Sequence, residues 1–282
     1  MNPEVLISSM NNPQIKNLAL LQRKAKARRE QGLFVVEGIK MIEEAKDSGL
    51  LVRVYVSESF YKDKADAALL FADMSYEVIT DAVFKQVSDT MTPQGIMGTV
   101  KAPAYSLDNI MAKEDAFLLL LEDIRDPGNL GTIIRTAEGA GATGIILNAS
   151  CADVLQPKVV RSTMGSIYRV PYYEAENFID ILSNLKTEGF AIYAAHLSGV
   201  SYDTKGGFLG RCGLLIGNEA NGLSDEATAI ADNLVRIPMS GKVESLNAAV
   251  AAAILMYEAA RQRNIIGEMA DNKVTNKTDE KS

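Results

Sequence analysis

A run of six apolar residues from Ala116 to Leu121 (AFLLLL) constrains the fold of this chain more than any other stretch. Such a run has no polar face, which is typical of a strand buried on both sides in a parallel sheet. The sequence after it alternates between short apolar runs and helical patterns. We expect strands at 144–147, 190–194, 213–216 and 234–237, with helices from 130, around 158–166, and at 178–188 and 225–231. This alternation predicts a parallel α/β domain.

The last predicted strand leads through a polar turn into an alanine-rich helix. From Ala248 to Tyr257 the helix has no charged residue, and it contains five alanines before Ile254. A helix that is apolar all round for nearly three turns is predicted to be buried on every side. Ser245 or Asn247 is suited to cap its N-terminus.

The first hundred residues predict a separate α/β/α domain. Asn12-Pro13 begins a helix that should end near Gly32. Strands are expected at 33–36, 51–56, 76–79 and 96–100, with helices at 39–48, 64–73 and 81–87. We therefore divide the chain into domains at 1–100 and 116–265, a linker at 101–115, and a disordered polar tail at 266–282.

Composition excludes several classes of protein. The 282 residues are 47% hydrophobic and 23% charged, as in ordinary globular proteins. No apolar run approaches the roughly 18 residues of a membrane span, and the first residues do not resemble a signal peptide. Cys151 and Cys212 are the only cysteines, and His196 is the only histidine. We expect a cytoplasmic protein with no structural disulfide, no metal and no membrane partner.

Basic residues gather near the N-terminus although the net charge is −7. The cluster contains Lys16, Arg23, Lys24, Lys26, Arg28 and Arg29. Such a run is either a solvated helix face or a surface that contacts RNA. The pattern alone leaves both interpretations open.

Residues 139–144 (GAGATG) match the dinucleotide-binding pattern G-x-G-x-x-G, but in the wrong context. That pattern must follow a strand and open a helix, so that the helix N-terminus meets the pyrophosphate. Here it ends a helix and leads into a strand. We interpret it as a glycine-rich helix stop.

Two further stretches place polar groups where parallel strands end. Asn129 follows the buried strand and is a natural N-cap. Arg135 lies in the mostly apolar helix after it, where an arginine must pair or reach a polar cavity. The loop 217–223 (GNEANGL) follows another strand and leaves backbone groups available to a ligand. Ser224 then caps the next helix.

Taken together, three stretches resemble the motifs of the SpoU (TrmH) branch of the SPOUT methyltransferases. The first motif is DPGNLGTIIRTAEGAGA (126–142), the second is LLIGNEANGLS (214–224), and the third is IPMSGKVESLNAAVAAAILMYEA (237–259). The resemblance covers residues 117–262. The region before it is similar to the substrate-binding domain of rRNA-modifying members, including Gly95 in TPQGI and the stretch 34–38.

The resemblance implies an enzyme that methylates a ribose 2′-hydroxyl in RNA, with S-adenosyl-L-methionine (AdoMet) as the donor. It implies a trefoil knot in the second domain and a homodimer that completes the site. Cofactor contacts carry over to Gly217, Asn218, Ile237, Pro238 and Leu246. Catalytic roles carry over to Asn129, Arg135, Glu219, Ser245 and Asn247. The expected RNA-binding residues are Lys16, Arg23, Lys24, Arg28, Arg29, Lys158 and Arg161, and the N-terminal domain favours rRNA over tRNA.

Arg135 is a poor candidate for the general base. Removing a proton from a guanidinium at neutral pH costs on the order of 8 kcal/mol. We therefore expect Arg135 to bind a phosphate and stabilise the developing alkoxide, with Glu219, water or a phosphate oxygen taking the proton. Two alternatives to an RNA methyltransferase remain open: a non-catalytic RNA-binding protein acting in ribosome assembly, and a methyltransferase with a non-RNA substrate.

Overall fold

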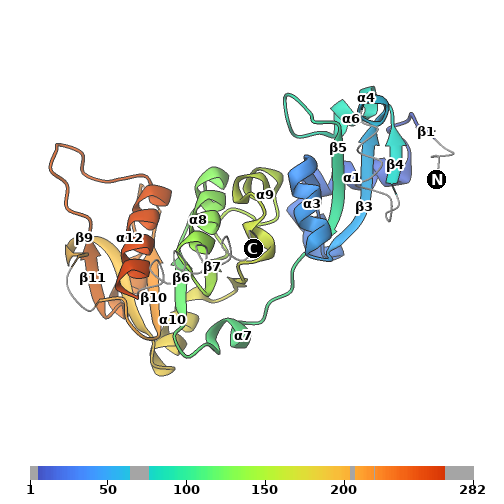
Figure 1. Ribbon diagram of the computed structural model, residues 1–282. Helices are drawn as coiled ribbons and strands as arrows, with labels where there is room; N and C mark the ends of the chain where they lie inside the picture. Colours follow the sequence, from blue (N-terminus) through green and yellow to red (C-terminus); the bar gives the residue numbers. More distant parts are fainter. Residues whose placement is uncertain (1–5, 64–75, 204–206, 219, 264–282) are drawn as a thin grey trace, which may run out of the picture. The chain divides into compact units, whose positions relative to one another are not determined.

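In the computed structural model, two sheets are formed by separate parts of the chain (Figure 1). The structure describes residues 6–63, 76–203, 207–218 and 220–263. The chain divides into one unit of residues 1–104 and 153–168, and a second of residues 105–152 and 169–282. The helix expected at 64–73 and the tail expected at 266–282 lie outside the described residues.

The first unit is built on a five-stranded mixed sheet of order β1-β4-β3-β5-β2. Strands β1, β4 and β3 are parallel, whereas β5 is antiparallel to both β3 and β2. The strands are β1 (Leu6–Ile7), β2 (Leu33–Glu37), β3 (Leu51–Ser57), β4 (Tyr76–Ile79) and β5 (Ile96–Lys101). The helices are α1 (Pro13–Arg23), α2 (Ala25–Gln31), α3 (Ile39–Asp47), α4 (Glu58–Asp63) and α6 (Asp81–Val87).

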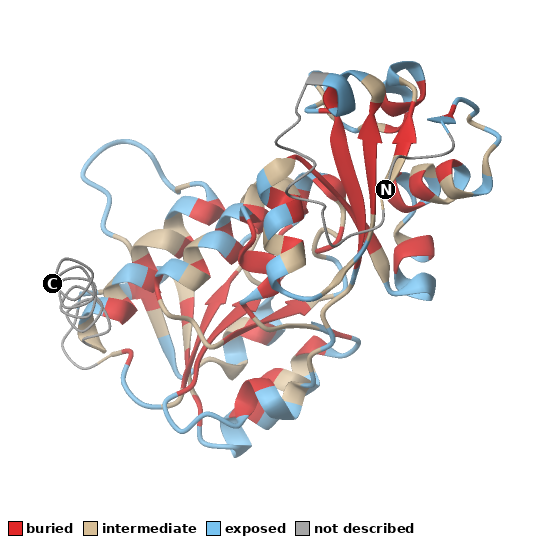
Figure 2. Cartoon of the chain, turned by 45° about the vertical axis from the view of Figure 1, so that its right-hand side comes forward, coloured by how far each residue is buried: buried red, intermediate tan, exposed pale blue. Residues whose placement is uncertain are grey.

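Helices cover both faces of this sheet. Helices α1 and α6 place Leu18 and Phe84 in one buried cluster with Tyr55 and Met97 of the sheet. Helix α3 packs on β2, β3 and β5 from the opposite side, where a Cβ at Gly98 would lie 2.7 Å from Ile42 Cδ1. The sheet is therefore a buried central layer (Figure 2).

The basic N-terminal stretch is two helices and not the single helix that the sequence predicts. Lys24 separates α1 from α2 with an extended backbone (φ −122°, ψ 111°). The break leaves carbonyl groups at the end of α1 available, and Arg28 Nη1 donates to the carbonyl oxygens of Leu21 and Gln22 at 2.6 and 3.3 Å. The buried guanidinium of Arg28 thus donates to carbonyl groups that backbone N–H groups would satisfy in a continuous helix.

The second unit contains a six-stranded sheet of order β11-β9-β10-β6-β7-β8, parallel throughout. Its strands are β6 (Phe117–Leu121), β7 (Gly144–Asn148), β8 (Tyr172–Ala175), β9 (Ala191–Ser201), β10 (Cys212–Ile216) and β11 (Asn233–Arg236). Its helices are α7 (Leu107–Met111), α8 (Pro127–Gly139), α10 (Phe178–Thr187), α11 (Asp225–Ile230) and α12 (Ala248–Gln262).

The predicted parallel α/β architecture is confirmed, and β6 is buried along its whole length. On one face, Leu118 and Leu120 belong to a cluster formed with α7, α10 and α11. Helices α8 and α12 pack against each other on the other face (Figure 1). The sequence missed β8 and ended β9 seven residues early, at Ala194 instead of Ser201. The trefoil knot stays a prediction.

Residues 139–144 form the predicted helix stop. Helix α8 ends at Gly139, Gly141 adopts a left-handed backbone (φ 74°), and β7 begins at Gly144. The prediction for α12 was wrong in one respect, because the helix is not buried on every side. Val250 is 48% exposed and Tyr257 is 47% exposed, so one apolar face of α12 is open in the single chain.

The segment that contains α9 (Pro157–Thr163) and the 3₁₀ helix η1 (Ser166–Tyr168) belongs to the first unit. Within that unit α9 packs on β2, and the rings of Phe34 and Tyr168 lie 6.2 Å apart. No local pattern distinguishes this segment from the α/β alternation around it, so the sequence placed it in the second domain.

Candidate active site

A cavity of about 380 Å³ lies in the second unit, where the second and third motifs meet. Ile216, the last residue of β10, and Ile237, the first residue after β11, line it. His196, in the middle of β9, lines it as well. The pairing of β9 with β11 shifts register between Leu234 and Val235, so residues 195–199 leave the regular ladder beside the cavity. This location agrees with the rule that ligands bind at the carboxyl ends of parallel strands.

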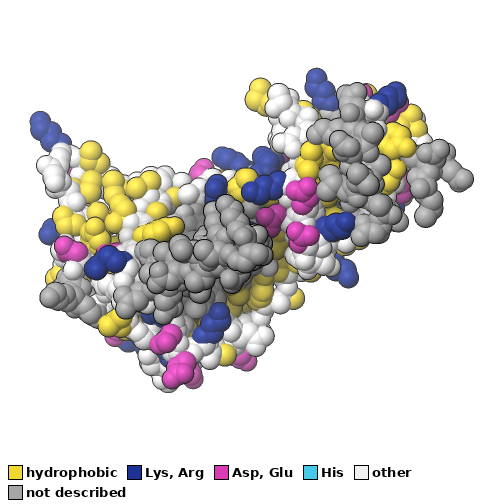
Figure 3. All heavy atoms as spheres, viewed as in Figure 1, with side chains coloured by type: hydrophobic (Ala, Val, Ile, Leu, Met, Phe, Trp, Pro, Cys, Tyr) yellow, Lys and Arg dark blue, Asp and Glu magenta, His cyan; other side chains and the backbone are white. Residues whose placement is uncertain are grey.

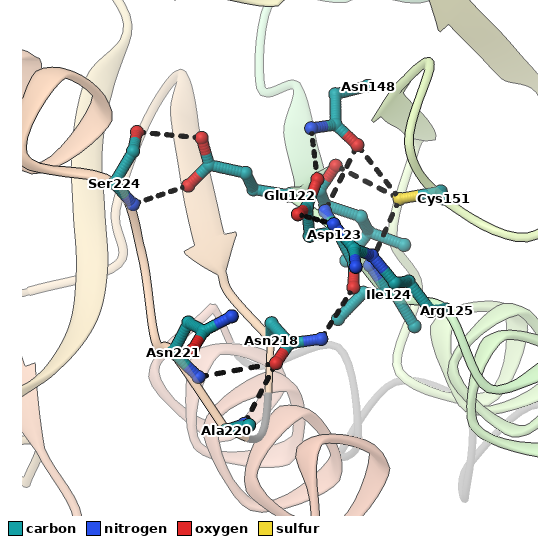
Figure 4. Close-up of polar contacts among 11 residues, drawn as sticks. Glu122, Asp123, Ile124, Arg125, Asn148, Cys151, Asn218, Ala220, Asn221 and Ser224 are labelled. Atoms are coloured by element: carbon teal, nitrogen blue, oxygen red, sulfur yellow. Dashed lines mark hydrogen bonds and ion pairs between the residues drawn. The ribbon is translucent and has the colours of Figure 1, made fainter.

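The described residues of the second-motif loop are joined to one another and to the segment after β6 by bonds of Asn218. The backbone N–H groups of Asn218 and Gly222 each donate to the other residue's carbonyl oxygen, at 3.1 and 2.9 Å. Asn218 Oδ1 accepts from the N–H groups of Ala220 and Asn221 at 2.8 and 3.2 Å. Its Nδ2 donates to the carbonyl oxygen of Asp123 at 3.0 Å (Figure 4). The Asn218 side chain therefore ties this loop to the segment after β6.

Gly217 lets the same loop close on itself. A Cβ at this position would lie 2.5 Å from both the carbonyl carbon and the oxygen of Gly222. Such contacts with backbone atoms cannot be relieved by rotating a side chain. The glycine is thus required by close packing, and no positive φ is involved.

A buried carboxylate fixes the other end of the loop. Glu122 is 8% exposed, and its two oxygens accept from the backbone N–H and the hydroxyl of Ser224 at 2.8 and 2.7 Å (Figure 4). Ser224 also caps α11 as the sequence predicts, because its Oγ accepts from the N–H of Ala227 at 3.1 Å. The end of β6 and the end of the loop are thus joined by hydrogen bonds to a charged group, which are the stronger kind.

The turn after β6 is held by Asn148 at the end of β7. Asp123 has a left-handed backbone (φ 58°) and exchanges two hydrogen bonds with the Asn148 amide, at 3.0 and 2.9 Å. The bond from Asn148 is the main cause that lowers the pKa of the Asp123 carboxyl, with Arg125 contributing as well. Cys151 lies beside this turn, and burial raises the pKa of its thiol to about 11.

Asn129 does not cap its helix, although the sequence suggested that role. Asp126 is the N-cap of α8, and its carboxylate accepts from the N–H of Asn129 at 2.8 Å. The Asn129 side chain instead accepts a hydrogen bond from Asn247 Nδ2 at 3.0 Å. Asn247 is the N-cap of α12, since its Oδ1 accepts from the N–H groups of Ala249 and Val250. The first and third motifs therefore meet through two predicted catalytic residues.

Arg135 is exposed on α8 and is not among the residues that line the cavity. The expectation that it must pair or reach a polar cavity is wrong for the single chain. Glu138, its neighbour on the helix, forms an ion pair with Arg169 instead. The side chain of Arg135 is thus exposed on α8 in the single chain.

Most of the predicted cofactor contacts lie at the cavity. Gly217, Asn218, Ile237 and Leu246 line it, as does Ser245, for which a catalytic role was predicted. Pro238 is exposed and does not line it. Glu219 lies outside the described residues. The sequence missed His196, Met239 and Glu244, which also line the cavity, because no periodic pattern marks an irregular strand or a loop wall.

The predicted RNA-binding residues differ in their surroundings. Lys16, Arg23, Lys24, Arg29 and Lys158 are exposed, and Arg161 pairs with Asp89 at 2.9 Å. Arg28 has to be removed from this group. It is 4% exposed, and its Nη2 lies 2.6 Å from Asp153 Oδ2. Its charge is therefore balanced by an ion pair within the first unit.

Two family models match separate parts of the chain. Residues 116–257 match the SpoU rRNA Methylase family, and residues 12–98 match the MRM3-like substrate binding domain. The chain is 33% identical to the 23S rRNA (guanosine(2553)-2′-O)-methyltransferase of Bacillus subtilis (strain 168), over 89% of this chain and 97% of that protein. It is 34% identical to the 23S rRNA (uridine(2479)-2′-O)-methyltransferase of Streptomyces viridochromogenes, over 87% of this chain and 88% of that protein.

The crystal structure of an AdoMet-bound rRNA methyltransferase from Sinorhizobium meliloti superposes with a TM-score of 0.79 at 33% identity, covering 91% of this chain and 97% of that one. The similarity thus extends over both units and not only over the motifs. The chain belongs to the SpoU rRNA methylase family.

Proposed function

We propose that this protein transfers a methyl group from AdoMet to a ribose 2′-hydroxyl of rRNA. The observation that carries the proposal is the cavity, which the second and third motifs enclose and to which Asn247 ties Asn129 of the first motif. The two relatives reported above are named as 2′-O-methyltransferases of 23S rRNA, and the neighbour from Sinorhizobium meliloti is named as AdoMet-bound.

The lining of the cavity fits AdoMet. Apolar side chains of Ile216, Ile237 and Leu246 offer surfaces for an adenine ring. The backbone of the loop at Gly217 and Asn218 supplies hydrogen-bonding groups, as small-molecule sites require. The carboxylate of Glu244 lies in the same lining and suits a cationic ligand. When bound, AdoMet would supply an electrophilic methyl group on a sulfonium.

The residues of the chain would act by positioning and by charge. Asn129 and Asn247 hold the first and third motifs together, which positions the polar groups around the acceptor hydroxyl. Arg135 binds a phosphate of the RNA in a bidentate manner and stabilises negative charge that develops on the 2′-oxygen. The proton of the hydroxyl passes to Glu219, water or a phosphate oxygen.

The position of Arg135 supports a homodimer. Helices α8 and α12 pack against each other, and Arg135 on α8 and Val250 and Tyr257 on α12 are exposed. Hydrophobic side chains gather on the α12 side of the second unit (Figure 3). An exposed apolar face on a helix that is otherwise buried is suited to self-association. We propose that a second copy covers it and brings its own Arg135 to the cavity.

Subunit complementation tests this arrangement. Arg135→Ala inactivates the arginine, whereas Gly217→Ala inactivates the cavity, and neither variant alone should methylate rRNA. If each site combines the two chains, a statistical mixture should recover about a quarter of the wild-type rate, because half of the dimers are mixed and each has one intact site. No recovery in a mixture that forms mixed dimers would contradict the shared site.

A map of the ribose methylation sites in rRNA tests the reaction itself. Ribose methylation across rRNA from a strain that lacks the protein should show one missing site, and the purified protein with AdoMet should restore it. The relatives are named for guanosine and uridine respectively, so the map also identifies the base. Failure of AdoMet to bind in calorimetry would favour a non-catalytic RNA-binding protein.

No helix among the described residues is long and apolar enough to cross a membrane. Cys151 and Cys212 are both free thiols. The free thiols support our proposal of a reducing cytoplasm.

A further inference from the structure

A second cavity, of about 330 Å³, lies in the first unit, far along the chain from the motifs. It opens where β3 ends at Ser57, where α6 begins at Asp81, and where the loop before β5 passes through Gln94 and Gly95. Strands β3 and β4 are parallel, so the cavity lies at the carboxyl ends of parallel strands, as the cavity in the second unit does.

Hydrogen bonds and close packing hold the walls of this cavity. Glu37 is 8% exposed, and its carboxylate accepts from the hydroxyls of Ser88 and Thr90 at 2.8 and 2.6 Å. These bonds brace the loop that reaches the cavity at Gln94. Gly95 has a left-handed backbone (φ 81°), and a Cβ there would lie 2.8 Å from Phe60 Cβ and 2.9 Å from Ser57 Oγ. The loop therefore packs closely against β3 and α4, and the cavity exists before any ligand binds.

The lining combines apolar walls with a small set of polar groups. Phe60, Phe84 and Pro93 supply the apolar part. Asp81 Oδ1 accepts from the hydroxyl and the N–H of Ser59 at 2.8 and 3.1 Å, and Ser59 Oγ lies 3.2 Å from Ser57 Oγ.

Two longer polar side chains complete the mouth of the cavity. Gln94 Oε1 accepts from the N–H of Ile39 at 3.3 Å, which leaves its amide nitrogen to donate to a ligand. Lys85 is exposed one turn after Asp81 on α6. The bonds from Ser59 hold the pKa of the Asp81 carboxyl below its ordinary value, and the charge of nearby Lys62 contributes. A carboxylate with hydroxyl and amide groups inside, and a cation at the rim, match a nucleotide, whose base carries donors and acceptors at its edge and whose phosphate is anionic.

We propose that this cavity receives an unpaired nucleotide of the rRNA substrate, with the base inside and its phosphate at Lys85. Sequence-specific proteins recognise RNA mainly through unstacked bases that enter such pockets, since A-form helices hide their base edges. The proposal rests on the proposed function for the identity of the RNA, and it gives the substrate-binding domain a specific contact in addition to the basic helices.

Three variants of the full chain test the proposal by filter binding to rRNA from a strain that lacks the protein, without AdoMet. Ser59→Phe fills the cavity without changing charge, and we expect rRNA affinity to fall by about tenfold or more with an unchanged salt dependence. Lys85→Ala should weaken binding and lower the slope of log affinity against log salt by about one. Gln94→Ala should weaken binding without changing the slope.

Matched controls are Ser48→Phe, an exposed serine at the end of α3, and Lys101→Ala at the opposite end of β5 from Gly95; neither residue lines the cavity. Both should bind rRNA as the wild type does, and thermal unfolding should show that every variant is folded. Wild-type rRNA affinity in folded Ser59→Phe overturns the proposal. The assay needs no methyl transfer, so an inactive protein that still shows this pattern would refute the proposed reaction and leave the nucleotide site standing.

Discussion

Asn247 Nδ2 donates a hydrogen bond to Asn129 Oδ1 at 3.0 Å, although 118 residues separate the two side chains. The bond joins the N-cap of α12 to the first turn of α8. It is possible because Asp126, and not Asn129, caps α8. Two polar residues that each had a local explanation are thus shown to form one unit beside the cavity.

Replacing Asn247 by serine separates its two roles. Serine caps a helix about as well as asparagine, but its side chain is too short to reach Asn129. We expect thermal stability close to that of the wild type and a rate of methyl transfer lower by roughly tenfold to a hundredfold, the range typical of lost positioning. Asn129→Ala should give a similar loss. Full activity in both variants would show that the pair has no catalytic role.

Glu122→Gln should loosen the second motif. The amide group of glutamine presents donors to a site where Ser224 already offers an N–H and a hydroxyl, so one buried donor loses its partner. We expect a loss of about 1–3 kcal/mol in the free energy of unfolding by urea, together with weaker AdoMet binding in calorimetry. Glu226→Gln, at an exposed position on α11, is the control and should change neither quantity.

Gly217→Ala should abolish AdoMet binding while the rest of the fold remains. The added methyl group would lie 2.5 Å from the backbone of Gly222, so the loop must move. Gly241→Ala is the matched control in the third motif, because a Cβ there has no neighbour within 4 Å among the described atoms. Equal AdoMet affinity in the two variants would contradict the close-packed loop.

Two arginines of the basic cluster should respond differently to the same substitution. Arg28→Met breaks a buried ion pair with Asp153, which typically costs about 3–5 kcal/mol of unfolding free energy. Arg23→Met changes an exposed residue and should leave stability within about 0.5 kcal/mol. If Arg23 contacts RNA, its loss should lower the salt slope of rRNA binding by about one. Urea unfolding measures the stability and filter binding measures the rRNA affinity. A larger loss of stability in Arg23→Met than in Arg28→Met would refute the assignment of Arg28 as the buried, paired arginine.

The thiols should be unreactive at neutral pH. Burial is the main cause that raises the pKa of Cys151 and of Cys212 to about 11, whereas an unfolded thiol ionises near its ordinary value of about 8.5. Protonated thiols are thus favoured in the folded state, and their contribution to stability is lost as the pH rises from about 8.5 towards 11. Iodoacetamide labelling at pH 8 should be slow in the folded protein and fast in urea, and equal rates would contradict the burial.

Local patterns in the sequence determined much of the fold. The apolar run 116–121 predicted a fully buried strand, and β6 is one because nothing polar interrupts it. The glycines of 139–144 predicted a helix stop, which requires only backbone conformations available to glycine. Ser224 caps its helix as predicted, and Asn247, one of the two predicted candidates, caps α12, since capping depends on neighbours two or three residues away. The three motifs also identified the family.

Only the tertiary structure decided which polar residues are buried and which side chains meet. Arg28 and Arg23 look alike in the sequence, and the difference between them depends on Asp153, which is 125 residues from Arg28. The open face of α12 and the exposure of Arg135 depend equally on distant packing, because an apolar pattern shows that a face can be buried and does not show what covers it. Hydrogen bonds such as Asn247–Asn129 form between elements brought together by folding, so no local pattern could predict them.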